Sequence, residues 1–391
     1  MPSDLAARRL RASAAFTLLG FDELEPAEQH RLATLREDPE FFGLLKPVNA
    51  LLPAKSVSKE AALLFLTLQR AQRIPALLAS MFGTDPSPLY GLVADGVLEV
   101  EHEGTFVSGR GALPLLSTAP PVTPTSHPTS RLSSAAIAHA AHYEGLDAAA
   151  LAQKVYAFGR QPCTAALRSR FARDRDLLAF LAADPGVAGL LTAHWAATAA
   201  EDSAWLSWST HTPTPRLGYK LYVSARIETM PRLFGMAVRA MRRVACPSFK
   251  IGRRGEGICR PDKMVAYFAS LEQLRECAGL VEAELLASDV TPASVHGVPF
   301  TAHIDGAGFL AWGMDPPELA HLTAALRVQS WRQWIAARVA IAVLSARSDA
   351  GPLDVVPFVL QRIELDGIDS RTWTPRLALW REHAASPGDV A

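Results

Sequence analysis

The sequence lacks the signals of several common protein classes. Its 391 residues carry 39 basic and 39 acidic side chains, so the net charge of zero provides no overall attraction to nucleic acid or to an anionic membrane. The four cysteines show no Cys-x-x-Cys spacing and no zinc-like pairing with histidine. This usage is typical of a reducing compartment, so we expect a cytoplasmic protein with no metal site.

Long apolar runs and nucleotide motifs are also missing. No stretch approaches the roughly 18 uninterrupted apolar residues that a membrane helix requires. The segment GRRGEG (252–257) has no Lys-Ser/Thr pair of the kind that ends a nucleotide-binding phosphate loop. We therefore expect no cofactor, and neither nucleic acid nor membrane as a partner.

The first 112 residues are predicted to form a helical domain that ends in a hairpin like the wing of a winged helix. Up to about residue 85 the pattern is helical, and we place Leu5, Leu10 and Phe16 in a first helix and not in a signal peptide. Residues 92–109 then indicate a strand, a turn at Glu103 and Gly104, and a second strand. This unit is either a small packing domain or a module that binds a peptide by strand addition.

A stretch rich in Pro, Ser and Thr follows, and we interpret residues 113–132 as a linker. Residues 133–391 then combine an Ala/Leu-rich helical region with an α+β domain whose core spans 217–347. His139 and His142 share one helical face without a third ligand, which favours a solvated or packed face over a metal site. Trp205 and Trp208 either close the edge of a core or stack on a substrate.

The predicted fold class is α+β, with a largely antiparallel sheet covered by helices on one face. We expect strands at 220–224, 248–251, 264–268, 299–304 and 309–312, helices at 230–244, 271–286 and 330–345, and a final strand within 358–373. Alternation places Lys220 and Lys250 on the same non-core face of this sheet.

Such a face offers chemistry. A partly desolvated lysine beside other cations has a lowered pKa and serves as a base. Arginines nearby suit a phosphate or carboxylate ligand, and we interpret RRGEG (253–257) as a mobile loop that closes over an anion. The alternative is an ordinary solvated basic face.

Six segments in order resemble the HopA-type effector family. They are KLYVSA (220–225), SFKIG (248–252), RPDKMVAYF (260–268), HGVPFTA (296–302), WGMDPP (312–317) and SWRQWIAARVAIAVL (330–344). The resemblance covers Tyr219 to Leu344, about a third of the chain. The residues that match the family pattern are Lys250, Arg260, Asp262, Tyr267, Gly297, Pro299 and Thr301. Ser224, Pro261 and Lys263 depart from it, which bears on substrate specificity and on activity.

The resemblance implies a lyase. HopA-like domains occur in the biosynthesis of ribosomally synthesised modified peptides, including class V lanthipeptides and thioamitides. There they are implicated in removing phosphate from phosphoserine or phosphothreonine to leave a dehydroamino acid such as dehydroalanine. The implied partners are a phosphorylated precursor peptide and a separate kinase.

This chemistry assigns roles to the candidate residues. Lys250 is the first choice for the base that takes the α-proton and Lys220 the second, while His296 or His303 protonates the leaving phosphate. We expect the phosphate to be bound by Arg260, Arg253, Arg254 and Lys263. The orienting residues are Asp262, Tyr267 and Thr301. For His303 and Asp262 the alternatives are an exposed strand position and a loop cap.

A rival interpretation needs no catalysis. The same basic face would serve a non-catalytic, effector-like accessory protein that binds a peptide or another protein. The two are distinguished by whether a phosphorylated peptide loses phosphoric acid.

Overall fold

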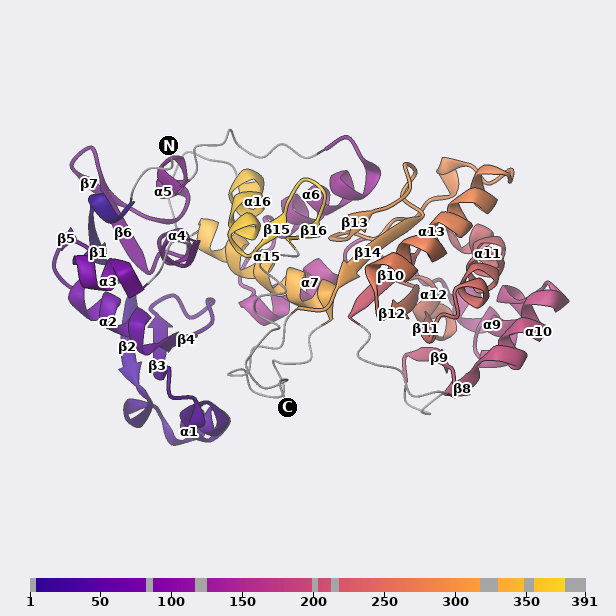
Figure 1. The fold of residues 1–391 in the computed structure, drawn as a ribbon, viewed down its shortest axis with the longest axis horizontal. Coiled ribbons are helices and arrows are strands. Elements are labelled where there is room, and N and C mark those ends of the chain that lie inside the picture. Colours follow the sequence, from indigo (N-terminus) through magenta and orange to yellow (C-terminus); the bar gives the residue numbers. More distant parts are fainter. Residues whose placement is uncertain are drawn as a thin grey trace.

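The computed structural model describes residues 5–81, 87–116, 125–198, 203–211, 218–316, 330–347 and 355–376. Within these ranges the chain is α+β, with antiparallel sheets at both ends of an elongated molecule (Figure 1). The N-terminal part lies at one end, the largest sheet lies at the other, and helices α6, α7, α15 and α16 lie between them.

Two small antiparallel sheets form the N-terminal part, with strand orders β5-β1-β6-β7 and β2-β3-β4. Their strands are β1 Arg9–Ala12, β2 Phe16–Gly20, β3 Phe41–Pro47, β4 Lys55–Ser58, β5 Gln72–Arg73, β6 Leu98–His102 and β7 Thr105–Val107. The helices are α1 Pro26–Arg31, α2 Lys59–Thr67, α3 Ala76–Met81, α4 Ser87–Ala94 and α5 Gly109–Leu116, with short 3-10 turns at Leu5–Ala7, Phe21–Glu23 and Ala33–Glu37.

The predicted hairpin is present, but the first predicted helix is wrong. β6 and β7 pair through a turn at Glu103 and Gly104, whose φ angles of 50° and 81° fit a tight hairpin turn. Leu10 and Phe16 lie in β1 and β2, where alternation buries them against the small core. A short apolar pattern fits both periods, and here pairing across the sheet decides between them.

The middle of the molecule is helical. It contains α6 Pro128–Ala140, α7 Ala148–Ala157, α8 Ala165–Arg170, α9 Asp174–Leu181, α10 Pro185–His194, α15 Trp331–Arg347 and α16 Val355–Leu365, followed by the small pair β15 Ile368–Asp369 and β16 Thr374–Pro375. The final strand predicted within 358–373 is wrong, because its first half is α16. Phe358, Val359 and Ile363 are spaced for one helical face, and they are buried.

The predicted linker is shorter than 113–132 in the structure. Residues 113–116 belong to α5 and residues 128–132 belong to α6, while residues 117–124 lie outside the described residues. Pro128 begins α6, where its missing N–H costs nothing and its fixed φ favours the first helical turn.

The largest sheet contains seven strands in the order β13-β14-β10-β12-β11-β9-β8, all paired antiparallel. The strands are β8 Ala196–Thr198, β9 Trp205–Ser209, β10 Tyr219–Val223, β11 Ser248–Gly252, β12 Met264–Phe268, β13 Ala302–His303 and β14 Leu310–Met314. The helices within this part are α11 Met230–Arg243, α12 Arg254–Ile258 and α13 Leu271–Leu286, with 3-10 turns at Ile227–Thr229 and Pro292–Ser294.

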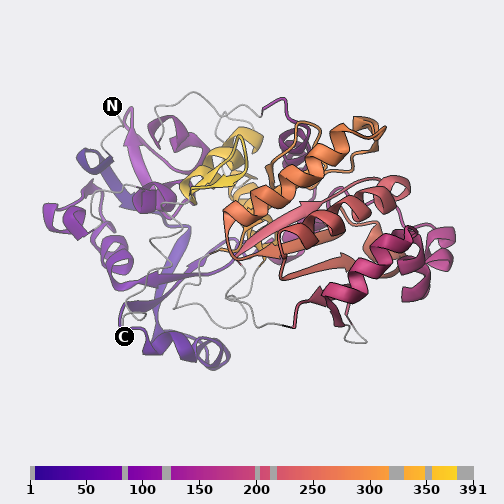
Figure 2. The ribbon, with the colours of Figure 1, turned by 45° about the vertical axis from the view of Figure 1, so that its right-hand side comes forward.

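Helices cover both faces of this sheet, and not one face as the sequence predicts. α11 and α13 lie side by side across one face, where they share an apolar core with the strands (Figure 2). On the other face, the buried side chains of Tyr222 and Val265 pack in one cluster with those of α15. That second face is apolar only in part, and its remainder holds the polar side chains described below.

In the described part of the chain, no single helix is both long and apolar enough to cross a membrane, although α9 and α10 reach that limit jointly across a bend of 117°.

The end of β11 is fixed by a contact that only glycine permits. A Cβ at Gly252 would lie 2.3 Å from the carbonyl oxygen of Gly257. We therefore expect Gly252→Ala to destabilise the protein by about 1–3 kcal/mol, because the two backbones must separate. Denaturant unfolding measures this change.

A matched control is Gly279→Ala on the exposed face of α13, where an added Cβ meets nothing within 4 Å. This change is expected to stabilise the protein by about 0.5–1 kcal/mol. A Gly252→Ala protein as stable as the natural one would contradict the close contact.

Candidate active site

One face of the large sheet brings together the lysines that the sequence singles out. Lys220 on β10 lies opposite Tyr267 on β12, and Lys250 on β11 lies opposite Val265 on β12. Because side chains alternate along each strand, Lys220, Tyr267 and Lys250 point to the same face, away from α11 and α13. Strand β9 adds Trp205 to this face, opposite Gly252.

The amine of Lys250 lies among aromatic rings. Its Nζ is 4.3 Å from the centroid of the Trp205 ring and 5.4 Å from that of the Tyr267 ring. Among the residues that the structure describes, this Nζ has no hydrogen-bond acceptor and no carboxylate within ion-pair distance. Burial, and after it the charge of Lys220, lowers the pKa of the Lys250 amine to about 8. A sizeable fraction of this amine is therefore uncharged near neutral pH.

Lys220 is held differently. Its ammonium donates to the carboxylate of Asp315, just beyond β14, and lies 5.5 Å from the centroid of the Tyr267 ring. Asp315 also accepts the backbone N–H of Trp331 at the start of α15, at 3.3 Å. The pair therefore fixes a positive charge beside Lys250 and joins the sheet to α15.

Asp262 organises the arginines of the site. Arg260 Nε donates to Asp262 Oδ1 at 2.9 Å, and Arg332 Nη1 lies 2.8 Å from Oδ2. The Tyr156 hydroxyl donates to Oδ2 at 3.0 Å and accepts from Arg260 Nη2 at 2.7 Å. Arg260 thereby lies with its guanidinium carbon 4.6 Å from the centroid of the Trp205 ring. Asp262 makes the contact that an orienting residue needs.

The Asp262 carboxylate stays ionised in its buried position. Burial acts to raise the pKa of Asp262, but the charges of Arg332 and Arg260 outweigh it and hold the pKa well below its ordinary value of 3.8. Burial raises the pKa of the Tyr267 hydroxyl, so this group remains protonated across the neutral range. The face thus offers an amine, a phenol and two further cations.

Lys263 and His296 form a separate pair beyond the end of β10. The Lys263 ammonium donates to the Ala225 carbonyl at 2.7 Å and to His296 Nδ1, while His296 Nε2 donates to the Gly159 carbonyl. Burial lowers the pKa of Lys263 to about 7, and burial followed by the Lys263 charge lowers that of His296 to about 4. The structure thus corrects both roles, because Lys263 is enclosed and His296 is neutral with both ring nitrogens occupied.

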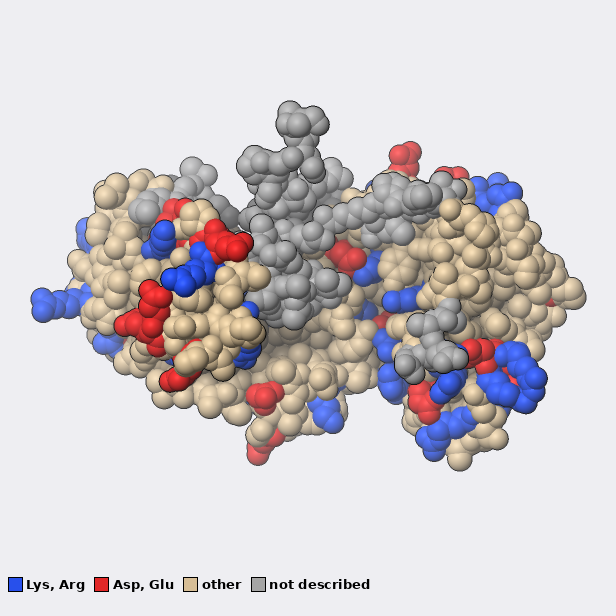
Figure 3. All heavy atoms as spheres, turned by 90° about the horizontal axis from the view of Figure 1, so that it is seen from below, with Lys and Arg blue, Asp and Glu red and all other residues tan. Residues whose placement is uncertain are grey.

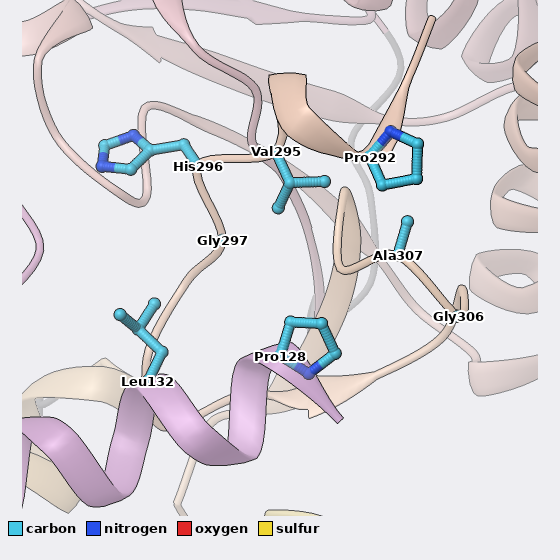
Figure 4. Close-up of a pocket in the computed structure, with 8 residues that line it drawn as sticks. All are labelled: Pro128, Leu132, Pro292, Val295, His296, Gly297, Gly306 and Ala307. Atoms are coloured by element: carbon cyan, nitrogen blue, oxygen red, sulfur yellow. The ribbon is translucent and has the colours of Figure 1, made fainter. Parts of the chain in front are cut away.

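A cavity of about 500 Å³ lies beside this pair (Figure 4). It is lined by Pro128, Leu132, Pro292, Val295, His296, Gly297, Gly306 and Ala307. The imidazole of His296 is turned away from the other lining residues. The lining is therefore apolar and does not suit a phosphate.

His303 also lies away from the lysines. It is on β13, and four strand spacings of the sheet, about 19 Å, separate β13 from the β11 strand of Lys250. Its ring stacks on that of His127 with centroids 3.9 Å apart, and burial followed by the charge of His127 lowers its pKa. His303 is therefore not placed to protonate a group at Lys250.

Thr301 has a turn-forming role. Its hydroxyl donates to the Val298 carbonyl at 2.6 Å, and it is fully buried. The neighbouring Asp305, which the sequence does not single out, accepts backbone N–H groups from Gly308, Phe309 and Leu310. Both side chains shape the segment that leads into β14, so neither meets the substrate side of the sheet.

Arg253 and Arg254 lie at the end of β11. The predicted mobile loop RRGEG is instead the short helix α12, anchored by the close approach of Gly252 and Gly257. Arg253 binds Asp174 with Nε at 2.7 Å from Oδ1. Both arginines line a second cavity that also includes Arg260, so they are near the lysine face but not on it.

Three residues of the site escape sequence reasoning. Asp315 and Arg332 lie within the WGMDPP and SWRQW segments, so the order of motifs carried a signal for them, although nothing marked their side chains as polar partners. Tyr156 lies in an ordinary Ala-rich helix and had no signal. Only the packing of α7 against α15 brings it to Asp262.

No protein-family model matches the sequence, and no curated protein does. Solved structures that are similar to part of the chain include effector proteins and phosphothreonine lyases. The effector protein from Pseudomonas syringae pv. tomato strain DC3000 is 10% identical, with 63% of this chain and 97% of that chain covered and a TM-score of 0.40.

Two of the similar structures are lyases by description. The phosphothreonine lyase OspF from Shigella flexneri is 13% identical over 30% of this chain and 68% of that chain, with a TM-score of 0.24. The phosphothreonine lyase SpvC, the effector protein from Salmonella, is 14% identical over 33% of this chain and 74% of that chain, with a TM-score of 0.25. At such identities and TM-scores, the function proposed below is based on the side chains themselves.

The buried charges predict a large effect of Asp262→Asn. Arg332 is 1% exposed, and without the carboxylate its charge lies in the interior with no counter-ion. We expect a loss of about 3–5 kcal/mol in the free energy of unfolding, measured by chemical denaturation.

Asp174→Asn serves as the control, since it removes the partner of Arg253 at a partly exposed position. Its expected cost is about 1 kcal/mol or less. Equal costs for the two variants would show that Asp262 is not the counter-ion on which the buried arginines depend.

Proposed function

We propose that the protein is a phosphoserine/phosphothreonine lyase that eliminates phosphate from a peptide. The observation that carries the proposal is the Lys250 amine, which is half-buried against two aromatic rings and has a pKa lowered to about 8 by burial and by Lys220. Among described residues it meets no acceptor, so its lone pair is available for a proton from the substrate.

The reaction needs a base, a phosphate site and a proton donor. Lys250 takes the α-proton, the C–H electron pair forms the Cα–Cβ double bond, and the bond from Cβ to the phosphate oxygen breaks. The electron pair of that bond stays on the phosphate. The products are a dehydroamino acid in the peptide and inorganic phosphate, and no water enters the bond.

Lys220 and Arg260 are the groups that hold the phosphate in this proposal. Lys220 is fixed by Asp315, and Arg260 is fixed by Asp262 through Nε and Nη2. Nη1 of Arg260 makes no contact of this kind among the described residues, so its N–H groups remain to bind a phosphate oxygen. Because both cations are already positioned, little ordering is needed as charge develops on the leaving group.

Tyr267 replaces the histidines as the proton donor. Its ring lies within 5.5 Å of the Lys220 ammonium and 5.4 Å of that of Lys250. Burial keeps the hydroxyl protonated by raising its pKa. We infer that this hydroxyl gives its proton to the leaving oxygen and recovers one from solvent.

The substrate is proposed to be a precursor peptide of a ribosomally synthesised natural product, as the class V lanthipeptides and thioamitides are. Support comes from the order of the motifs that resemble the HopA-type family. A separate kinase would supply the phosphorylated residue, because the elimination consumes a phosphate ester that this chemistry does not create. The product would carry dehydroalanine or its methyl homologue.

A phosphothreonine peptide is the first test. With the natural protein we expect inorganic phosphate and a peptide lighter by the elements of phosphoric acid, as seen by mass spectrometry. Lys250→Met should lower the rate at least about 10²-fold, because the base is gone while the ring contacts of the side chain persist.

Lys59→Met, at an exposed position on α2, is the matched control and should retain full activity. Release of phosphate with threonine restored would identify a phosphatase instead. Binding of the peptide without any change in mass would favour the non-catalytic accessory protein.

The pH profile gives an independent test. Lys250 must be uncharged to accept a proton, so log(kcat/KM) should rise with pH and level off above about 8. The second ionisation of the phosphate ester, near pH 6, lies lower and is separable from this limb. A profile that stays flat as the pH rises toward 8 would remove Lys250 as the base.

A further inference from the structure

A basic cavity lies at the end of the strand that carries Lys250. It has a volume of about 340 Å³ and lies where β11 passes into α12. Its lining residues are Arg160, Ser203, Ala204, Arg253, Arg254, Glu256, Gly257 and Arg260. Four of the eight lining residues are arginines, which sets it apart from the apolar cavity beside His296.

The charges of this cavity are only partly compensated. Arg253 is paired with Asp174, and Arg260 is paired with Asp262. Arg160 and Arg254 are exposed and form no ion pair with any described residue. Glu256 is the acidic residue in the lining, so the cavity carries a net positive charge. Figure 3 shows basic side chains gathered on the lower face of the half of the molecule that contains the sheet.

The cavity is adjacent to the proposed active site but distinct from it. Lys220, Lys250 and Tyr267 do not line it, whereas Arg260 belongs to both. Arg254 follows Lys250 by four residues, and four residues of extended chain span at most about 14 Å. An extended substrate that places its phosphate beside Lys250 therefore reaches the cavity within about four residues.

The backbone of the cavity wall is fixed and strained. Arg254 has a φ of 60°, a left-handed conformation that costs a residue with a side chain of order 1 kcal/mol. The close approach of Gly252 to Gly257 holds the backbone on both sides of it. The strain aims an unpaired guanidinium at a defined position, which a merely solvated arginine does not require.

We propose that this cavity binds a second anionic group of the substrate peptide, within about four residues of the phosphorylated one. The group is an Asp or Glu carboxylate or a second phosphate, since arginine recognises both through paired N–H groups. This inference rests on the proposed lyase function and adds a preference for acidic or multiply phosphorylated sequences to it.

Synthetic peptides test the cavity. Each carries one phosphothreonine in an otherwise neutral sequence, with Asp, Asn or phosphoserine placed at one of the four positions on either side. We expect KM to be about tenfold lower for at least one Asp or phosphoserine peptide than for its Asn counterpart, with kcat little changed. Tighter binding of either anion supports the inference, and the tighter one identifies the preferred group.

Charge-removing variants locate the effect. Arg160→Gln combined with Arg254→Gln should abolish the difference between the acidic and neutral peptides without changing kcat on the neutral one. Arg243→Gln, at an exposed position at the end of α11, is the matched control and should leave the difference unchanged. Raising the salt concentration should weaken the preference, because the two arginines are exposed and screened.

Failure of this inference is distinguishable from failure of the lyase. Equal KM values for all peptides, with normal elimination, would overturn the cavity proposal and leave the lyase standing. If no peptide is converted, fluorescence anisotropy of labelled peptides still measures the preference in binding. Equal affinities of the natural protein and the double variant for the acidic peptide would then overturn the inference.

Discussion

The arrangement of the site depends on one buried carboxylate. Asp262 lies between Arg260, Arg332 and the Tyr156 hydroxyl, all within 3.0 Å of its oxygens. Removing three charged groups from water is costly, and only mutual neutralisation in good geometry offsets that cost. The cluster therefore fixes Arg260 beside Trp205 and joins β12, α7 and α15, which otherwise contribute from distant parts of the chain.

This constraint explains why a lysine remains without a counter-ion. The carboxylates nearest the face, Asp262 and Asp315, already serve Arg260, Arg332 and Lys220. Lys250 is left with aromatic faces, which attract its cation less than a carboxylate would. Its ammonium form is therefore disfavoured by burial without full compensation, and this imbalance gives the amine its basic character.

Local patterns predicted the sheet and its polar face but not the partners. Alternation in YKLYV and SFKIG correctly places Lys220 and Lys250 together, because a strand has only two faces. His296 and His303 were given a catalytic role from side-chain chemistry alone, yet the sheet order separates His303 from Lys250, and a hydrogen bond to Gly159 occupies His296. Tyr156 lies 106 residues from Asp262 in sequence, and no local signal reports such a contact.

Strand β9 has one tryptophan on each face of the sheet. Trp208 stacks on Phe249 in the core, with ring centroids 5.0 Å apart, whereas Trp205 lies beside Lys250 and Arg260. A shift of one residue in the pairing with β11 would exchange the two indoles and disrupt both surroundings at once. Folding to the wrong register is thus penalised twice, and a polypeptide that has completed its interior has, by the same step, assembled its reactive surface.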